Sequence, residues 1–600
     1  MARRSTNGGR GIGHGSALAD CAACPTGCAL DGSAEATRSR ANGTAGTASA
    51  NNRACAPDPA GLGDRLNFRV RCCSRAEDAR AVEVEAVGEF DYVIVGAGSA
   101  GCVLASRLTQ EPDLRVLLLE AGAKDRKFEI RVPAAFSKLY RSEVDWGYST
   151  TPQPGLAGRE VYFPLGKTLG GSSSINAQMV IRGHRADYDG WATGGSPGWA
   201  WEDVLPYFER SAAGPFEITD LRDRNLLTEA FVAAAVETGL TRADDLNAPE
   251  PEGVGYVRVS QRRGRRWSVA DGYLRPALSR PNLTVLTAAQ ATRVVIEGGR
   301  ATGVSYRREG RDEQARAAGE VILCGETIHS PHLLLVSGVG SRAGLAAAGV
   351  ELVHELPGVG QNLQDHLVGG ILAASTSDKT LYAADSPANL VRFLLLRRGM
   401  LTSNVAEAAA FVRTGSDLLA PDLELVFAPV LFAEEGLVPP PEHGITIGTV
   451  VLQPRSVGRV ELRSADPFDP PQVDPGYLSD PDGDDLRILL HGVRLARRIL
   501  AAPALAPYVR EELLPGSDAR SDEQLTDQAR AHAQTLYHPV GTCRMGTDEG
   551  AVVDPELRVH GIEALRVVDA SVMPRIPRGH TNWPTVMIAE KAANLIRGTD

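Results

Sequence analysis

Two stretches of the chain, residues 91–101 and residues 537–546, hold the residue types and spacing best suited to chemistry. The second stretch places His538 in a run rich in Gly, Thr and Pro, which is typical of a loop. Because imidazole titrates near neutral pH, His538 is a candidate catalytic base. The first stretch is rich in glycine and predicts a turn that holds a dinucleotide.

Residues 92–119 predict a strand, a helix and a second strand, because a short apolar run, a helically spaced run and another apolar run follow one another. The turn after the first strand carries Gly96, Gly98 and Gly101. These glycines would let the backbone approach a pyrophosphate at the N-terminus of the helix. Glu120 ends the second apolar run and is placed to accept hydrogen bonds from an adenosine ribose.

Three further segments are candidates for lining the same ligand. Residues 166–177 are too rich in Gly and Ser for a core element, so they form either a flexible loop or a loop whose N–H groups line a cofactor. Residues 330–340 follow the apolar run 321–324 and predict another turn from strand to helix that faces the dinucleotide. Residues 357–366 add a Gly-rich loop, in which we expect His366 to be structural.

These motifs follow one another along the chain as they do in a known family. Over residues 88–597 the sequence resembles the glucose-methanol-choline (GMC) flavin oxidoreductases. The resemblance rests on the glycine turn, the segments 166–177 and 330–340, His538 within its motif, and the closing stretch 569–588. It implies an enzyme in which FAD takes a hydride from an alcohol carbon. The implied fold class is α/β, with a Rossmann-like FAD-binding domain and a discontinuous α+β substrate domain built on an antiparallel sheet.

The resemblance assigns catalytic roles to two residues. Oxidising an alcohol requires the hydroxyl proton to leave while hydride moves from carbon to flavin N5, so a base must lie within hydrogen-bond reach of the oxygen. His538 would be this base, and Asn582 would orient the hydroxyl. The helix predicted for residues 582–596, with Pro584 near its start, would point its N-terminus at the flavin and stabilise the charge of reduced flavin.

The residues expected to contact FAD come from several parts of the chain. They are Gly96, Gly98, Gly101, Glu120, Gly170, Gly171, Asn176, Asp569, Ala570, Asn582 and Thr585. Asn176 would donate a hydrogen bond to a flavin carbonyl. Ile175 stands where covalently flavinylated relatives have histidine, so FAD should be bound non-covalently. Val180, Glu326 and His580 also depart from the family pattern, at positions that are usually aromatic, Gly and Asn.

Residues 371–535 should supply most of the substrate side. The runs 450–454 and 458–463 predict strands of a sheet that forms one wall of the pocket. Glu407 matches an acid that contacts the quaternary ammonium in choline-oxidising relatives, although a solvated surface acid is an equal alternative. Because Val426 replaces a histidine common in choline enzymes, we favour an apolar or aliphatic primary alcohol over choline.

Two other classes of function are weighed against alcohol oxidation. Fatty acid photodecarboxylases share the implied fold and FAD, but their cysteine and arginine would fall at Ala406 and Val426, and they lack the histidine found here as His538. A non-enzymatic flavin-binding protein would keep His538 and Asn582 without using them. The electron acceptor, whether oxygen, a quinone or a carrier, is open.

The length and composition fit this interpretation. Six hundred residues exceed what one hydrophobic core usually supports, so we expect more than one packed unit. Residues 86–370 and 536–600 should mainly bind FAD, with insertions from the substrate domain, and residues 371–535 should mainly bind substrate. A composition of 43% hydrophobic and 23% charged residues is that of an ordinary globular protein. The net charge of −11 argues against nucleic acid or an anionic membrane as the main partner, because both would repel it. No apolar run approaches the ~18 residues of a membrane span.

The first 85 residues differ from the rest of the chain. They are rich in Ala, Gly, Ser, Thr, Asn and Arg without a periodic apolar pattern, which predicts a disordered leader. The expected localisation is cytoplasmic, or plastid or mitochondrial if residues 1–85 are a transit peptide; a start site placed too far upstream is the competing explanation. Six of the nine cysteines lie here, but Cys21, Cys24 and Cys28 have no convincing fourth ligand, so no metal is expected.

Overall fold

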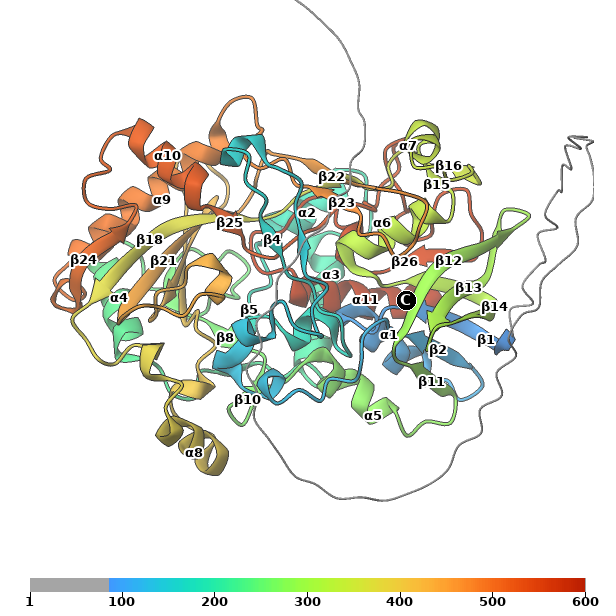
Figure 1. The fold of residues 1–600 in the computed structure, drawn as a ribbon, viewed down its shortest axis with the longest axis horizontal. Helices are drawn as coiled ribbons and strands as arrows, with labels where there is room; N and C mark the ends of the chain where they lie inside the picture. The colour runs from blue at the N-terminus through green and yellow to red at the C-terminus, as the bar shows by residue number, and fades with distance from the viewer. Residues whose placement is uncertain (1–85, 599–600) are drawn as a thin grey trace, which may run out of the picture. The chain divides into compact units, whose positions relative to one another are not determined.

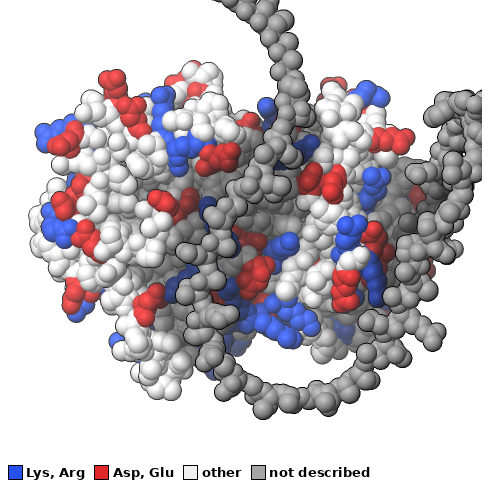
Figure 2. Space-filling model, in the orientation of Figure 1, with Lys and Arg blue, Asp and Glu red and all other residues white. Residues whose placement is uncertain are grey.

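The computed structural model describes residues 86–598, and the predicted leader, residues 1–85, lies outside this range with its cysteines. The other three cysteines, Cys102, Cys324 and Cys543, are buried free thiols. Among the described residues, none of the helices is long and apolar enough to cross a membrane. Figure 2 shows one face of the molecule, on which acidic and basic side chains lie interspersed.

A seven-stranded sheet, at the right of Figure 1, is built around the glycine-rich unit. Its strands run in the order β11 (Leu283–Leu286), β2 (Val116–Leu119), β1 (Ala86–Val95), β14 (Arg311–Leu323), β13 (Arg300–Arg308) and β12 (Ala289–Glu297), and β26 (Leu565–Val567) also pairs with β14. Strand β1 is parallel to β2 and β14, and α1 (Ser99–Leu108) connects β1 to β2. The predicted strand, helix and strand are therefore confirmed.

Burial on both faces explains why the central strands lack polar alternation. All four residues of β2 are buried, and Val93 and Ile94 of β1 are fully buried. Strands of a parallel sheet that are covered on both sides read as continuous apolar runs. The polar residue that ends β2, Glu120, consequently marks the edge at which the strands stop and ligand-binding groups begin.

Helix α11 (Asn582–Arg597) packs against α1 and α3 (Trp201–Ala212), and Figure 1 shows it beside α1. The fully buried carboxylate of Glu590 accepts hydrogen bonds from Arg107 Nε and Nη2 at 2.9 and 2.7 Å. It also accepts one from Tyr273 Oη at 2.6 Å. Because a buried carboxylate is costly without partners, these bonds hold α11 in register with α1.

A second seven-stranded sheet, at the left of Figure 1, is antiparallel throughout. Its order is β24 (Val509–Leu514), β18 (Leu367–Ser375), β21 (Gly444–Val451), β20 (Leu423–Ala428), β19 (Ala408–Val412) and β7 (Gly253–Tyr256), and β25 (Gln534–Thr535) also pairs with β18. Helices α4 (Leu226–Glu237) and α9 (Asp484–Ala501) share a hydrophobic core with this sheet.

The two runs predicted as strands of the pocket wall, 450–454 and 458–463, lie in different sheets. Residues 450–451 do belong to β21 of the antiparallel sheet. The other run forms β22 (Gly458–Glu461), which pairs instead with β17 (Gln361–Leu363) and β23 (Gln472–Asp474) in a separate three-stranded sheet. An alternating pattern predicts a half-buried strand, but it does not specify the partner strands, so the placement of 458–463 in the wall was wrong.

The turn predicted for residues 330–340 was also misplaced, because α6 (Glu326–Val336) already includes Ser330 and Pro331. Pro331 lacks the N–H that would bond to the carbonyl of Thr327 four residues earlier. The Thr542 hydroxyl donates to that carbonyl instead, at 2.5 Å. A distant side chain therefore lets a proline lie inside the helix, and the turn from strand to helix lies earlier, at Gly325 and Glu326.

The remaining α-helices, and the strands that belong to smaller sheets, are short. The helices are α2 (Arg185–Thr193), α5 (Arg275–Ala277), α7 (Arg342–Ala347), α8 (Pro387–Leu396) and α10 (Asp522–His532). The strands are β3 (Tyr148–Ser149), β4 (Tyr162–Phe163), β5 (Met179–Val180), β6 (Thr219–Asp220), β8 (Arg258–Val259), β9 (Gln261–Arg262), β10 (Arg265–Arg266), β15 (Val339–Gly340) and β16 (His354–Glu355).

Removal of the buried carboxylate between α11 and α1 should destabilise the fold. We expect Glu590→Ala to lower the free energy of unfolding by about 3 kcal/mol, because it leaves the guanidinium of Arg107 mostly buried without its partner. Urea titration followed by circular dichroism measures the change. As a control, Asp312→Ala removes the exposed ion pair with Arg307 and should cost at most about 1 kcal/mol. Equal losses in the two variants would contradict this assignment.

Candidate active site

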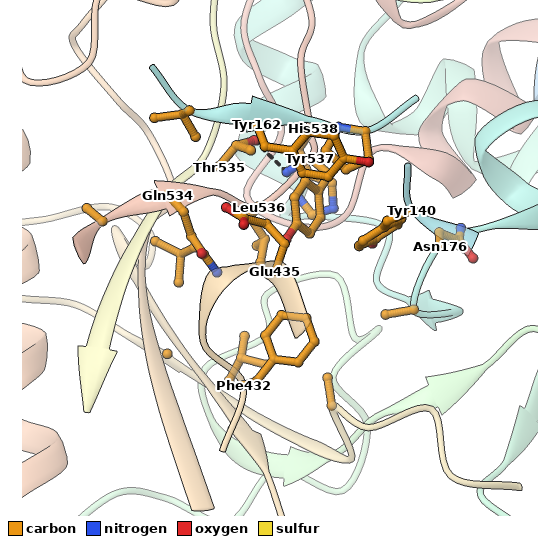
Figure 3. Close-up of a pocket in the computed structure, with 18 of the residues that line it drawn as sticks. Tyr140, Tyr162, Asn176, Phe432, Glu435, Gln534, Thr535, Leu536, Tyr537 and His538 are labelled. Carbon is orange, nitrogen blue, oxygen red and sulfur yellow. Dashed lines mark hydrogen bonds between the residues drawn. The ribbon is translucent and has the colours of Figure 1, made fainter. Parts of the chain in front are cut away.

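A cavity of about 1010 Å³ lies where the glycine-rich unit, the antiparallel sheet and the loop of His538 meet, and Figure 3 shows part of its wall. Seven of the predicted site residues line it: Asn176, Val426, His538, Asp569, Ala570, Asn582 and Thr585. A smaller cavity of about 80 Å³ is lined by Gly96, Gly98, Glu120 and Gly171. Cys324 and Glu326 line both cavities, so the two spaces adjoin at these residues.

The three glycines of the first turn are needed for different reasons. Gly96 has a φ of +102°, and a Cβ on Gly101 would lie 1.9 Å from the carbonyl oxygen of Gly96, so the turn itself requires both. Gly98 has an ordinary φ of −75°, and a Cβ there would meet only an oxygen of Glu326, at 3.6 Å. Close approach of a ligand explains Gly98 better than the fold does.

The carboxylate of Glu120 is hydrogen-bonded to the backbone of the glycine-rich turn. It accepts hydrogen bonds from the backbone N–H of Ala97 at 2.9 Å and of Gly122 at 2.8 Å. Burial raises its pKa to about 7, against which these two hydrogen bonds act. Glu120 therefore lies at the end of β2 with its carboxylate held at the edge of the smaller cavity, as the ribose-binding role requires.

The segment 166–177 is an ordered wall of the larger cavity. Asn176 accepts with Oδ1 from Gln178 N at 3.0 Å and from Arg266 Nη1 at 2.7 Å, which leaves its amide N–H groups as donors. Arg266 is buried and also donates to the carbonyls of Ile130 and Ser173. Burial lowers the pKa of Arg266 to about 9. No sequence motif indicated this arginine, because its partners are distant in the chain.

Helices α1 and α11 both begin at the cavity without a side-chain cap. Asn582, the first residue of α11, accepts a hydrogen bond with Oδ1 from Ser99 Oγ of α1 at 2.7 Å. The first N–H groups of a helix have no partner inside the helix, so uncapped N-termini favour an anion or a polar ligand. Both helix ends are thus directed at the space that the predicted cofactor residues line.

A buried carboxylate positions the loop of His538. Asp365 accepts hydrogen bonds from the backbone N–H of His538 at 2.8 Å, from Thr535 Oγ1 at 2.6 Å and from the hydroxyl of Tyr477. Burial raises the pKa of Asp365 to about 6. Asp365 was missed as a site residue, although it lies beside His366 in the segment that the sequence had indicated.

The ring of His366 fixes the proton on the ring of His538. His366 Nε2 lies 3.1 Å from the carbonyl oxygen of Leu452, which can only accept, so Nε2 carries the proton. Burial lowers the pKa of His366 to about 3, so the ring is neutral and its Nδ1 is an acceptor. His538 Nδ1 lies 3.0 Å from that atom and must donate to it. The unprotonated nitrogen of a neutral His538 is consequently Nε2.

A third histidine adjoins this pair. The ring centroids of His538 and His580 are 4.6 Å apart, and His580 Nε2 lies 3.2 Å from Glu424 Oε1. Burial, His580 and His366 together hold the pKa of His538 well below 6.5. Glu424 is fully buried in β20, and its Oε2 has no hydrogen-bond partner among residues 86–598. Glu424 could not be identified as a site residue beforehand, because in sequence it looks like any other acid in a strand.

Glu407 does not line the cavity. Its carboxylate is buried and accepts hydrogen bonds from Ser403 Oγ at 2.6 Å, Thr228 Oγ1 at 2.8 Å and the backbone N–H of Asn225 at 2.9 Å. It is therefore neither the ammonium contact nor the solvated surface acid that were considered. Val426, on β20, does line the cavity.

Comparison with known proteins identifies the family. Residues 90–368 match the N-terminal model and residues 454–589 the C-terminal model of the GMC oxidoreductases. The chain belongs to the GMC oxidoreductase family and is an oxidoreductase, as its motifs predicted.

Named relatives cover most of the chain. An uncharacterized GMC-type oxidoreductase of Mycobacterium tuberculosis is 49% identical over 85% of this chain and 99% of its own length. An alcohol dehydrogenase [acceptor] of Pseudomonas putida is 42% identical over 84% of this chain and 95% of its own. A mitochondrial choline dehydrogenase of Mus musculus is 42% identical over 87% of this chain and 91% of its own.

Solved structures have the same fold. Pyridoxine 4-oxidase from Mesorbium loti superposes with a TM-score of 0.77 at 32% identity, over 84% of this chain and 98% of its own. Formate oxidase of Aspergillus oryzae RIB40, whose FAD modification has been studied, gives a TM-score of 0.80 at 26% identity, over 86% and 99%. The fold is therefore the mixed α/β fold of FAD-dependent GMC enzymes.

The residues present fit FAD. An adenosine ribose and a pyrophosphate match the carboxylate at the end of β2 and the glycine turn before α1. The uncapped start of α11 matches the negative charge of a reduced flavin. Ile175 offers no nucleophile for a covalent bond at its position.

The different roles of the glycines predict different effects of a single methyl group. Gly98→Ala should fold with a near-normal melting temperature but bind FAD roughly tenfold more weakly, a loss of about 1.4 kcal/mol. Gly101→Ala should disrupt folding, because its Cβ would overlap the carbonyl of Gly96. Melting curves and the flavin absorbance of the purified variants test both. Normal FAD affinity in Gly98→Ala would contradict the ligand-based explanation of Gly98.

Proposed function

We propose that this protein oxidises the CH–OH group of an apolar primary alcohol to a carbonyl, with His538 as the base. The observation that carries the proposal is the fixed tautomer of His538, which presents an unprotonated Nε2 in a ring that lines the cavity. FAD, when bound, would supply the hydride acceptor. The residues of the chain would bind and orient the alcohol and move its proton.

The environment of His538 suits the removal of a hydroxyl proton. Its depressed pKa keeps the imidazole neutral at working pH, and its Nε2 has no other hydrogen-bond partner among the described residues. A substrate hydroxyl can therefore donate to Nε2 and transfer its proton there. The hydrogen bond from Nδ1 to His366 keeps the ring in one orientation throughout.

Asn582 would hold the substrate oxygen. Its Oδ1 already accepts from Ser99, so the amide N–H groups are the available donors. A donor beside the alcohol oxygen stabilises the negative charge that develops as the proton leaves. His538 and Asn582 thus offer an acceptor and a donor to the same hydroxyl group.

The walls of the cavity favour an apolar substrate. Phe136, Tyr140, Ile371, Leu372, Val426 and Phe432 all line it. Glu407, the predicted ammonium contact, lies outside the cavity, where its carboxylate accepts three hydrogen bonds. An aliphatic chain would gain free energy by contact with these side chains, at about 25 cal/mol for each Å² buried.

A choline-type alcohol is the second candidate, and one observation favours it. Glu435 lines the cavity near Tyr140, Tyr162 and Tyr537, as Figure 3 shows. Aromatic faces with an acid can bind a quaternary ammonium group. However, burial raises the pKa of Glu435 to about 7, so much of its negative charge is lost near neutral pH.

We further propose non-covalent FAD and a division of labour between the chain segments. Residues 86–370 and 536–600 would mainly bind FAD, supported by the glycine turn and the start of α11. Residues 371–535 would mainly bind substrate, supported by the strands of the antiparallel sheet that line the cavity.

Replacement of the base should slow the chemistry and leave cofactor binding intact. His538→Ala should keep FAD bound but reduce the rate of anaerobic flavin reduction by an alcohol about 10²–10⁴-fold. In the unmodified protein, the neutral imidazole is the active form and its pKa is depressed. The rate of flavin reduction should therefore stay constant as the pH is lowered to 6.5, and it should decline only at lower pH. Stopped-flow absorbance measures both effects, and unchanged reduction in His538→Ala would refute the assignment of the base.

His366 would act through the tautomer of His538 and is therefore a positioning residue. Gln at this position can donate to the carbonyl of Leu452 and accept from His538 Nδ1, whereas Leu can do neither. His366→Leu should slow flavin reduction about 100-fold and change its pH profile, and His366→Gln should stay within about tenfold of the unmodified rate. If Gln and Leu are equally slow with unchanged pH profiles, packing rather than the tautomer is the role of His366.

A further inference from the structure

Glu326 is an unusual residue for the position it occupies. It is the first residue of α6, directly after the turn from β14, and has a φ of +65°. Residues with a Cβ rarely adopt this left-handed conformation, which glycine adopts readily. Its side chain lines both the larger and the smaller cavity, so the carboxylate lies where the two spaces adjoin.

The carboxylate of Glu326 lies directly against the glycine-rich turns. Its Oε1 accepts hydrogen bonds from Ser172 Oγ at 3.0 Å and Ser172 N at 3.4 Å. The same oxygen would lie 3.2 Å from a Cβ on Gly171 and 3.6 Å from a Cβ on Gly98. Gly98 is the residue before the uncapped N-terminus of α1, so an acid lies at the end of α1 that favours an anionic ligand.

The charged groups around Glu326 do not neutralise it. Asp569 accepts a hydrogen bond from the backbone N–H of Glu326 at 3.0 Å. The negative charges of Asp569 and Glu120 both raise the pKa of Glu326. His329, on the next turn of α6, is kept neutral because burial lowers its pKa to about 3. The positive charge of Lys167 lowers the pKa of Glu120, but it is not among the charges that shift the pKa of Glu326. Within residues 86–598, Glu326 has no basic side chain within 4 Å of its carboxylate.

We infer that Glu326 couples FAD binding to a proton, because its carboxyl group must be neutral when the diphosphate occupies the turn beside Gly98. The inference rests on the proposed function, in that FAD is taken to bind at this turn. It concerns this chain in particular, since the residue replaces the glycine expected here and is not one of the groups assigned to the reaction.

The direction of the coupling follows from charge. A diphosphate and an ionised Glu326 repel, whereas a protonated Glu326 can still donate a hydrogen bond to a phosphate oxygen. FAD therefore binds best to the protonated form, and its affinity falls as pH rises through the pKa of Glu326 in the FAD-free protein. Burial raises that pKa to about 7, which places the loss of affinity at and above neutral pH.

Glu120 titrates in the same range but with the opposite effect. Burial raises its pKa to about 7, and ribose hydroxyls donate more strongly to its ionised form, so its ionisation favours FAD. The pH dependence of the unmodified protein combines the two carboxyl groups. We therefore divide the FAD dissociation constant of the unmodified protein by that of a Glu326 variant at each pH. Glu120 is present in both proteins, so the change of this ratio with pH reports on Glu326.

The test is equilibrium dialysis of the full-length holoenzyme at a series of pH values from about 6 to 9, with released FAD measured by fluorescence. Glu326→Gln keeps the size and the hydrogen bonds to Ser172, and Glu326→Gly restores the residue suited to this φ. We expect the dissociation constant of the unmodified protein, divided by that of either variant, to rise by up to about tenfold per pH unit above neutral pH.

A matched control separates Glu326 from other buried acids. Glu435 also has a pKa raised to about 7 by burial and lines the larger cavity, but it does not line the smaller cavity at the glycine turn. Glu435→Gln should follow the pH dependence of the unmodified protein. A ratio that is constant with pH in both Glu326 variants would overturn the inference while leaving FAD binding intact. Failure of all the proteins to bind FAD at any pH would instead overturn the proposed function.

Discussion

The site depends on one chain of hydrogen bonds, from the carbonyl of Leu452 through His366 to His538. A buried imidazole can carry its proton on either nitrogen, and only its partners decide between them. The carbonyl can only accept, so it fixes the proton of His366, and His366 in turn fixes that of His538. The basic nitrogen at the cavity is thus determined by a backbone atom that does not itself line the cavity.

The fold places the ring of His538 and the first residues of α1 and α11 on the walls of one cavity. Ser99 and Asn582 are separated by 483 positions in sequence yet share a hydrogen bond at the N-termini of α1 and α11. The Glu590 contacts hold the two helices in register. Asp365, between β17 and β18, holds the backbone of His538 at the same place. These three sets of contacts therefore join segments that are distant in the chain around one cavity.

Local pattern predicted the parts of the structure that local physics determines. The strand, turn and helix of residues 92–108 follow from apolar runs and glycines, and α11 follows from its helical spacing. Glu407 could not be placed from sequence, because Ser403 and the N-terminus of α4 decide whether its carboxylate faces the cavity. Asp365, Glu424 and Arg266 were missed for the same reason, since each acts on residues distant in the chain. Pro331 is another such case, because the distant hydroxyl of Thr542 compensates for a local helix-breaking signal.

The most direct test of alcohol oxidation is the flavin absorbance of the full-length protein, mixed anaerobically and in the dark with aliphatic, aromatic and choline-type alcohols. We expect rapid bleaching by aliphatic primary alcohols and slower bleaching by choline, because apolar side chains line much of the cavity and the carboxylate of Glu407 lies outside it. No bleaching by any alcohol in the dark, with a fatty acid consumed under blue light, would contradict it and favour photodecarboxylation.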